Sequence, residues 1–403
     1  MHRVAVTGLG VISALGVGRE AHFDGLAEGR NGIRQLEMRD VERLMIQIGA
    51  QVKGFDETAY FGRQELALFD RVTQFALVAA AEAFEQSGLE ITDDLGLQTA
   101  TIIATAMGGL HTQDENYRTV YQDQKNRVHP FIIPRLMANA PVSQVSMKYG
   151  LKGPAYSVAT ACASSNHAIG QAFNLVRSGA ARAAVTGGTE SVLVFGGVKA
   201  WEGLRVMSKD GCRPFSKTRN GMVLGEGCAI LILERMEDAV ARGATVLAEI
   251  CGVGATADAS DIVAPDADGA SRAMILALAD AGMRADEVGY INAHGTATAM
   301  NDRTEAAAIR QALGPAADDV MVSSTKSMHG HAIGAAGALE AAAVLMALQK
   351  GVIAPTINYD EPDPEITLDV VPNQAREAKI GAALSNAFAF GGLNAVLAFR
   401  AAD

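Results

Sequence analysis

Apolar segments of strand length alternate with alanine-rich helical segments along the whole chain, and this alternation limits the fold more than any other feature. Segments 71–88 and 270–282 carry apolar residues at helical spacing and end in glycine, as helices commonly do. Strands buried between helices have near-continuous apolar sequences, so the pattern predicts an α/β protein in which helices cover mixed sheets. The expected strands are 3–8, 99–106, 182–188, 227–234, 244–254, 288–294, 319–324 and 394–400.

One short sequence occurs twice. HAIG stands at 167–170 and again at 331–334, each time where a long helical pattern begins. Together with the repeated order of strands and helices, this echo predicts two similar halves, 1–244 and 245–403.

Composition limits the partners and the compartment. The formal net charge is −11, which disfavours a general nucleic-acid-binding role and allows an acidic partner only at a local basic patch. We find no cleavable leader and no apolar run long enough to span a bilayer, so we expect a cytoplasmic protein without a membrane span. None of the four cysteines sits in a CxxC pair, which argues against a zinc site or a disulfide scaffold.

Cys162 stands where a chemically active thiol is expected. YSVATA before it is typical of a strand, and SSNHAIG after it is typical of a helix, so Cys162 lies at a strand-to-helix turn. The free N–H groups at a helix N-terminus stabilise a thiolate and an oxyanion. The alternative is a small buried thiol, and this stretch alone leaves the two equally favoured. His167 is a poor partner, because five helical residues rotate by roughly 500°, which turns it away from Cys162.

Two distant segments supply better partners. INAHGT places His294 at the end of an apolar strand, where α/β sheets bind ligands. STKSMHGH places Lys326 and His331 before a glycine-rich helix start, a donor-rich surface suited to a developing anion. A zinc site is the rival explanation, but the spacings offer no local chelating pair. TGLG at 7–10 is an incomplete dinucleotide motif and is interpreted as a tight turn.

The chain closely resembles, essentially end to end, the β-ketoacyl-acyl-carrier-protein synthases of the KAS I/KAS II type. The resemblance rests on VTGLGVISALG, YGLKGPAYSVATACASSNHAIG, CRPFSKTRNGMVLGEG, INAHGTATAMND, STKSMHGHAIGAAGALE and LSNAFAFGGLNAVL. RPFS, VKAWE and SNAFAFGG are similar to the nodulation protein E branch. The resemblance implies a thiolase-like five-layered αβαβα sandwich of two similar halves, a homodimer and an acyl carrier protein as partner, with no cofactor.

The resemblance also implies roles for single residues. Cys162 would take an acyl group as a thioester, and His294 and His331 would bind the malonyl thioester and support its decarboxylation. Lys326 would position the site, and Glu305 would anchor Lys326 by an ion pair. The backbone N–H groups of Cys162 and Phe390 would form the oxyanion hole.

Further positions match the family's binding sites. Thr296 and Thr298 match threonines that bind pantetheine or malonyl groups, Phe388 and Phe390 match gating phenylalanines, and Met107, Phe131 and Ile132 match residues of the acyl tunnel, the last two reaching the partner's tunnel. Lys125 and Arg127 match docking residues for the carrier, and Asn292, Glu340, Ser385 and Asn386 match a structural monovalent-cation site.

Some positions depart from the family pattern. Ala389 replaces a glycine in the gating loop, and because alanine does not readily adopt positive φ we expect a stiffer loop. Ser216 and Asn220 replace aspartates, and His329 replaces a threonine beside His331. These departures are compatible with a specialised acyl or polyketide pathway.

Two other functions remain open. A silent subunit that shapes a partner's tunnel typically lacks the cysteine that this chain has. Thioester hydrolysis or simple decarboxylation needs the same residues as condensation.

Overall fold

Two halves of the chain form five strands each with the same order and directions. The computed structural model describes residues 1–402. If the five strands of each half are numbered in chain order, they lie side by side in the order 3-2-4-5-1. Strands 3, 2 and 4 are parallel to one another, and strand 5 is antiparallel to its neighbours 4 and 1. The first half contains β1 (Val4–Ser13), β5 (Thr99–Ala104), β6 (Ala155–Val158), β7 (Ala183–Glu190) and β8 (Gly227–Arg235). The second contains β9 (Ala248–Ala257), β10 (Tyr290–Asn292), β11 (Met321–Ser323), β14 (Ala382–Ala389) and β15 (Leu393–Arg400).

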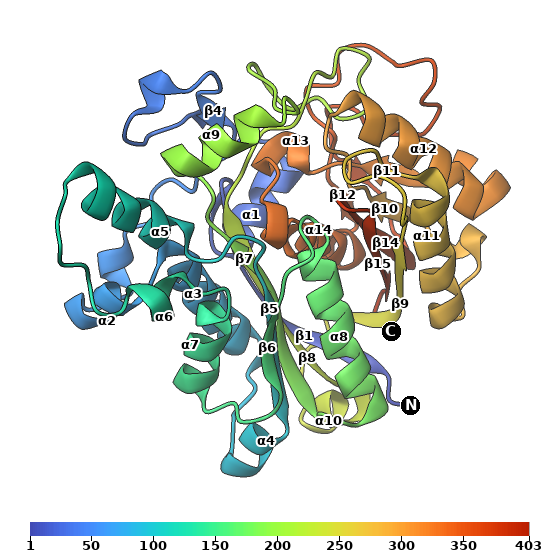
Figure 1. Cartoon of the computed structure of the whole chain (residues 1–403). Helices are drawn as coiled ribbons and strands as arrows, with labels where there is room; N and C mark the ends of the chain where they lie inside the picture. The colour runs from blue at the N-terminus through green and yellow to red at the C-terminus, as the bar shows by residue number, and fades with distance from the viewer. Residues whose placement is uncertain (403) are drawn as a thin grey trace.

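Helices form the other layers of the sandwich (Figure 1). α3 (Arg71–Ser87) and α7 (Ala140–Tyr149) cover the first set of strands, and α11 (Ala267–Ala281) with α12 (Ala299–Leu313) covers the second. Between the sets lie α8 (Ser164–Ser178) and α14 (Ala336–Lys350), which contact strands of both halves. The HAIG at 167–170 lies in the first turns of α8, and the HAIG at 331–334 comes just before α14. The expected five-layered fold is confirmed. The boundary at 244/245 stays a prediction; it falls between β8 and β9.

Smaller elements complete the chain. β1 and β9 pair at Val4–Val6, so the two sets form one continuous sheet, with β2 (Gly16–Val17) at its side. The short helices are α1 (Arg19–Ala27), α2 (Arg63–Leu68), α4 (Asp93–Leu97), α5 (Leu110–Tyr117), α6 (Ile132–Leu136), α9 (Phe195–Gly203), α10 (Met236–Ala241) and α13 (Lys326–His329). Two small sheets pair β3 (Arg34–Gln35) with β4 (Ile48–Gly49) and β12 (Val352–Ile353) with β13 (Arg376–Glu377).

The most apolar helix is the centre of the core. The stretch Ile333–Lys350 is long and apolar enough to cross a membrane by composition, but 83% of it is buried inside the protein. A helix buried on all sides needs apolar residues around its whole circumference, which explains the composition.

The interpretation of TGLG as a tight turn is wrong. Residues 7–10 lie inside β1, and the two glycines make room for α3. A Cβ on Gly8 would lie 2.2 Å from the Ala83 carbonyl oxygen, and one on Gly10 would lie 1.9 Å from that of Ala79. The glycines therefore serve close packing of a helix on a strand.

Candidate active site

Cys162 lies in a strained turn between β6 and α8. Ala161 has a φ of 47°, a left-handed conformation that costs a non-glycine residue on the order of 1–3 kcal/mol. The Ser164 hydroxyl holds the turn by donating to the Ala161 carbonyl at 2.6 Å and accepting from the Thr160 N–H at 2.8 Å. His167 points back to the same turn, with Nδ1 2.9 Å from the Thr160 hydroxyl. The turn thus fixes the thiol at the start of α8, and His167 has a structural contact.

The two predicted histidines converge on this thiol. His294 follows β10 and His331 follows α13, and both side chains are buried. Nε2 of His331 lies 3.0 Å from Sγ of Cys162, and the two imidazole rings meet edge to face with centroids 5.4 Å apart. The structure therefore brings Cys162 together with two histidines that lie more than a hundred positions after it in the sequence.

The neighbours of the histidines fix which ring nitrogen carries the proton. Burial and the nearby Lys326 charge lower the pKa of both rings well below the usual range, so both are neutral. The Ile333 N–H donates to Nδ1 of His331 at 3.3 Å, and the Lys326 ammonium lies 3.4 Å from Nδ1 of His294. With each Nδ1 accepting, each proton is on Nε2, so both rings present Nε2–H donors.

This tautomer also bears on the metal alternative. The ligand atoms of Cys162, His294 and His331 all lie within 4.8 Å of one another, close enough to hold an ion. A histidine that binds a metal through Nε2 normally donates Nδ1–H to a second partner. Here the groups facing the two Nδ1 atoms are themselves donors, which opposes metal binding at Nε2.

The thiol is protonated at rest and is surrounded by groups that stabilise its anion. Burial raises the pKa of Cys162 to about 11, while the Lys326 charge and the N–H groups of Phe390 and of Cys162 itself act in the opposite direction. These two N–H groups belong to the residues that are expected to form the oxyanion hole, an assignment that stays a prediction.

The ion pair of Lys326 differs from the expectation. Lys326 is fully buried and pairs with Glu340 rather than with Glu305. Glu305 instead accepts the N–H groups of His294 at 2.8 Å and Gly295 at 2.7 Å. Glu305 lies on α12 and thus fixes the loop that carries His294, a role its sequence position could not reveal.

Four buried oxygens beside this pair have no hydrogen-bond partner among residues 1–402. Burial raises the pKa of both Glu340 and Glu305 to about 7; the Glu305 charge raises the pKa of Glu340 further, and the Asp302 charge raises that of Glu305. A cation would satisfy the oxygens and offset this charge. The four are Asn292 Oδ1, Glu340 Oε2, Ser385 Oγ and Asn386 Oδ1, which are the predicted cation-site residues.

A pocket of about 310 Å³ opens above the thiol. The three site residues Cys162, His294 and His331 form part of its wall. The predicted binding residues Thr296, Thr298, Phe388 and Phe390 also line it. Met107, Phe131 and Ile132 do not line this pocket; Met107 and Phe131 are 43% and 47% exposed on the surface of the chain.

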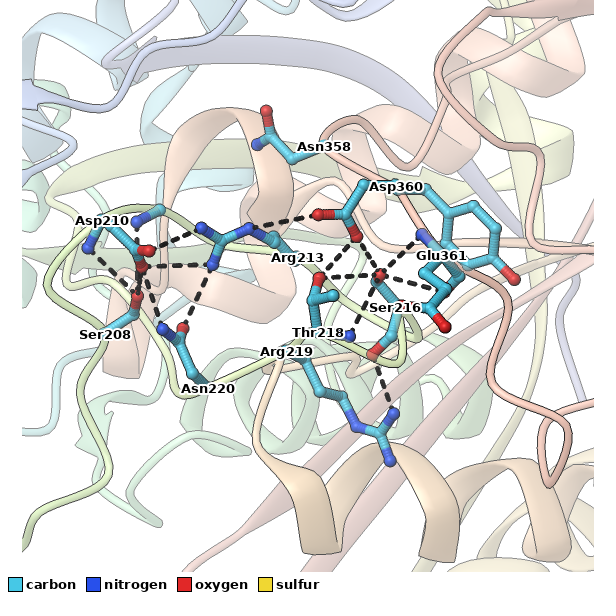
Figure 2. Close-up of polar contacts among 12 residues, drawn as sticks. Ser208, Asp210, Arg213, Ser216, Thr218, Arg219, Asn220, Asn358, Asp360 and Glu361 are labelled. Atoms are coloured by element: carbon cyan, nitrogen blue, oxygen red, sulfur yellow. Dashed lines mark hydrogen bonds and ion pairs between the residues drawn. The ribbon is translucent and has the colours of Figure 1, made fainter.

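The rim of the pocket is held by a polar network (Figure 2). Asn220 lines the pocket and donates to Asp210 at 3.0 Å, and Arg213 binds both of them. Ser216 hydrogen-bonds Asp360, which ties the rim loop to the segment after β12. The residues at 216 and 220 that depart from the family pattern therefore act here as uncharged members of this network.

Two further points correct or extend the sequence analysis. Ala389 is the last residue of β14, paired with Leu393, and its φ is not positive, so alanine fits this position without backbone strain; the expected stiffening of the loop stays a prediction. Arg205 was missed: it lines the pocket mouth, is exposed and has no ion-pair partner among residues 1–402. The sequence alone could not identify Arg205 as a binding residue, because its position at the pocket mouth depends on the folded conformation of its loop.

Comparisons with known proteins agree with this site. The profile of the β-ketoacyl synthase N-terminal domain matches residues 1–239, and that of the C-terminal domain matches 247–360. Nodulation protein E of Rhizobium sp. (strain N33) is 45% identical over 99% of both chains, and 3-oxoacyl-[acyl-carrier-protein] synthase 2 of Synechocystis sp. is 42% identical over 99% of this chain and 98% of the relative.

Solved structures are similar over their whole length. The ishigamide ketosynthase/chain length factor superposes with a TM-score of 0.95 at 36% identity, covering 100% of both chains. A type II polyketide ketosynthase in complex with its acyl carrier protein superposes with a TM-score of 0.91 at 33% identity, again over 100% of both chains. Sequence profiles, relatives and fold all agree, and the chain belongs to the β-ketoacyl synthase family.

Proposed function

We propose that this protein catalyses the decarboxylative condensation of malonyl-acyl carrier protein with an acyl group held on Cys162. The observation that carries the proposal is the convergence of two neutral Nε2–H donors on one thiol that also faces two backbone N–H groups. This arrangement offers one nucleophile and two separate sites for negative charge, which is what a two-step acyl transfer needs.

The first step loads the enzyme. The Cys162 thiol loses its proton, and the sulfur attacks the thioester carbonyl of an acyl carrier. The N–H groups of Cys162 and Phe390 bind the oxyanion of the tetrahedral intermediate. The carrier thiol leaves with a proton, and the acyl group stays on Cys162 as a thioester.

The second step forms the carbon–carbon bond. The malonyl thioester carbonyl accepts hydrogen bonds from Nε2–H of His294 and His331, with Thr296 and Thr298 beside the bound arm. Cleavage of the bond to the carboxylate releases CO₂ and leaves the electron pair as an enolate, which these donors stabilise. The enolate carbon attacks the acyl carbonyl, the C–S bond breaks, and β-ketoacyl carrier and the Cys162 thiolate are formed.

A primer panel tests the proposal. Acyl carriers of increasing chain length are incubated with malonyl carrier and the protein, and products are resolved by mass. We expect a β-ketoacyl product two carbons longer than the accepted primer. Free fatty acid, or acetyl carrier as the only product, would instead favour hydrolysis or simple decarboxylation; no product from any primer would favour a silent subunit.

We propose a cytoplasmic homodimer as the working form. All four cysteines are free thiols, which suits a reducing compartment. Exposed apolar side chains gather in the segment from Met107 to Met137 and on the edge strand β6 at Tyr156, a surface that a second copy would cover. Met107 would then face the tunnel, with Phe131 and Ile132 reaching the partner's tunnel. A monomeric mass by light scattering at micromolar concentration would contradict this proposal.

Carrier docking is expected to depend on exposed basic side chains. Lys125 and Arg127 are exposed, with Lys125 beside Asp123, and Arg205 stands at the pocket mouth. Charge reversal at all three should raise the carrier KM by about tenfold with kcat nearly unchanged, because such charges act mainly on encounter. Lys379→Glu is the control, since Lys379 is exposed and precedes the opposite end of β14. An unchanged KM in the triple variant would exclude this docking surface.

A monovalent cation is expected to stabilise the fold. Asn292, Glu340, Ser385 and Asn386 would hold it through their unpartnered oxygens. At about ten times its Kd, potassium or sodium should raise Tm by roughly 1–2 °C relative to choline at equal ionic strength. Ser385→Ala should weaken the response, whereas Thr186→Val, which removes an unpartnered buried hydroxyl in the other half, should not. Equal Tm values in all three salts would contradict the cation site.

A further inference from the structure

A buried histidine stands between two residues of the active site and has no part in the proposed reaction. His329 is the last residue of α13, the single helical turn that begins at Lys326, and His331 follows two positions later. Its side chain is fully buried, with its ring centroid 6.0 Å from that of His22. This is the position at which a histidine replaces the threonine of the family pattern, so a role here would be particular to this chain and its nearest relatives.

The backbone just before His331 contains a glycine that allows rotation. Gly330 has a φ of 66° and no space for a side chain, because a Cβ there would lie 2.8 Å from a neighbouring side-chain atom. His331 itself is tied to the rim of the pocket: its N–H donates to the Val223 carbonyl at 2.7 Å, and its carbonyl accepts from the Gly225 N–H at 2.9 Å. The Gly330–His331 peptide is therefore the adjustable link between α13 and this anchored segment.

The His329 ring holds this link from the side of α13. Its Nδ1 lies 2.9 Å from the Gly330 carbonyl oxygen, and its Nε2 lies 3.0 Å from the Thr325 hydroxyl. Burial lowers the pKa of His329 to about 3, so the ring is neutral and carries one proton. Because a carbonyl can only accept, this proton is on Nδ1, and Nε2 accepts the Thr325 O–H. His329 therefore has the opposite tautomer to His331.

The two contacts of the ring lie at opposite ends of α13. Thr325 directly precedes Lys326, and Gly330 directly precedes His331, so the His329 ring connects the points at which the two site residues join the helix. A threonine offers one hydroxyl where the imidazole offers two separate nitrogen atoms. The imidazole thus fixes the direction of the Gly330 carbonyl, and with it the peptide from which the His331 side chain reaches the thiol.

We propose that His329 is a positioning residue, which fixes the Gly330–His331 peptide and thereby keeps the Nε2–H of His331 directed at the malonyl carbonyl. The inference rests on the proposed function, because the step that it supports is the decarboxylation of the malonyl thioester. In that function the acylation of Cys162 uses backbone N–H groups rather than His331 for its oxyanion. Loss of the His329 contact should therefore slow decarboxylation much more than acylation.

The first test compares two variants of similar size and shape, His329→Asn and His329→Leu. Both leave the Thr325 hydroxyl without its acceptor, but only asparagine places an N–H near the position of Nδ1. CO₂ release from malonyl carrier and acylation of Cys162 by acetyl carrier are measured separately. His329→Leu should slow decarboxylation by about tenfold and change acylation by no more than about twofold, whereas His329→Asn should keep both rates within about threefold of the unmodified protein.

A role in packing alone predicts a different pattern. Loss of packing in α13 would lower Tm and slow both reactions by similar factors, because Lys326 and His331 would move together. Equal slowing of decarboxylation and acylation in His329→Leu, or equal slowing of decarboxylation in both variants, would overturn the inference and leave the proposed function intact.

The position of one proton gives a second test that needs no variant. Neutron diffraction from crystals of the unmodified protein locates the protons of the buried imidazoles. The proton of His329 is expected on Nδ1, directed at the Gly330 carbonyl oxygen, and that of His331 on Nε2. A His329 proton on Nε2 would overturn the inference, because Nδ1 could not then donate to Gly330. Unmodified protein that neither releases CO₂ nor forms an adduct on Cys162 would overturn the proposed function and, with it, this role of His329.

Discussion

Cys162→Ala is expected to lower the rate of condensation by about 10⁴-fold or more, whereas decarboxylation of malonyl carrier should persist. The acyl intermediate needs the sulfur, so no acyl group can be loaded. The donors that stabilise the enolate are the two imidazoles, whose tautomers are fixed by the Ile333 N–H and by Lys326 and do not depend on the thiol. The assay follows CO₂ release and β-ketoacyl product in the same reaction.

Cys228→Ala is the matched control for this variant. Cys228 is also a fully buried thiol, but it lies in β8 among apolar residues, and burial raises its pKa further than that of Cys162. Condensation by this variant should match that of the unmodified protein. Condensation by Cys162→Ala within tenfold of the unmodified rate would show that another group carries the acyl chain.

His294→Ala and His331→Ala should each lower the rate of malonyl decarboxylation by about 10²–10³-fold, the usual effect of losing one oxyanion donor. Acylation of Cys162 should be much less affected, because its oxyanion is bound by backbone N–H groups. Single-turnover measurements of each step separate the two effects. His167→Ala serves as the control, because the His167 ring hydrogen-bonds to Thr160 and Ala163 in the turn before α8.

The pH dependence distinguishes donor imidazoles from imidazolium ions. Because burial and Lys326 lower the pKa of both rings well below the usual range, both stay neutral as pH rises from about 6 to 8, and the decarboxylation rate should not fall. If a protonated histidine were required, the rate would fall as pH rose through its pKa. A tenfold fall over this range in the unmodified protein would contradict the donor role.

The class of site followed from the sequence, but its electrostatics did not. Each catalytic residue stands at the end of a strand pattern or at the start of a helix pattern, so its chemical context was visible. The partner of Lys326 was not, because Glu340 is on α14 and Glu305 is on α12, and only packing decides which carboxylate is nearer. The tautomers of His331 and His294 depend on where the Ile333 N–H and the Lys326 ammonium point. A sequence pattern does not predict these orientations.

For the fold too, local sequence patterns predicted some elements, whereas tertiary contacts decided others. Long apolar strands such as β8 and helices such as α3 were visible because their periodicity is strong. β14 was not among the expected strands, because Ser385 and Asn386 interrupt its apolar sequence; both are fully buried beside the candidate cation site. The glycines of β1 were mistaken for a turn because the close approach of α3 is a tertiary contact.

The most direct test of the account follows one acyl group through the site. The protein is loaded with an isotopically labelled acyl group, freed of the carrier, and mixed with malonyl carrier; intact protein and product are then weighed by mass spectrometry. The account predicts that the label leaves Cys162 and appears in a β-ketoacyl carrier two carbons longer, with one CO₂ released for each chain. Label that stays on Cys162, or that leaves as free acid, would contradict it.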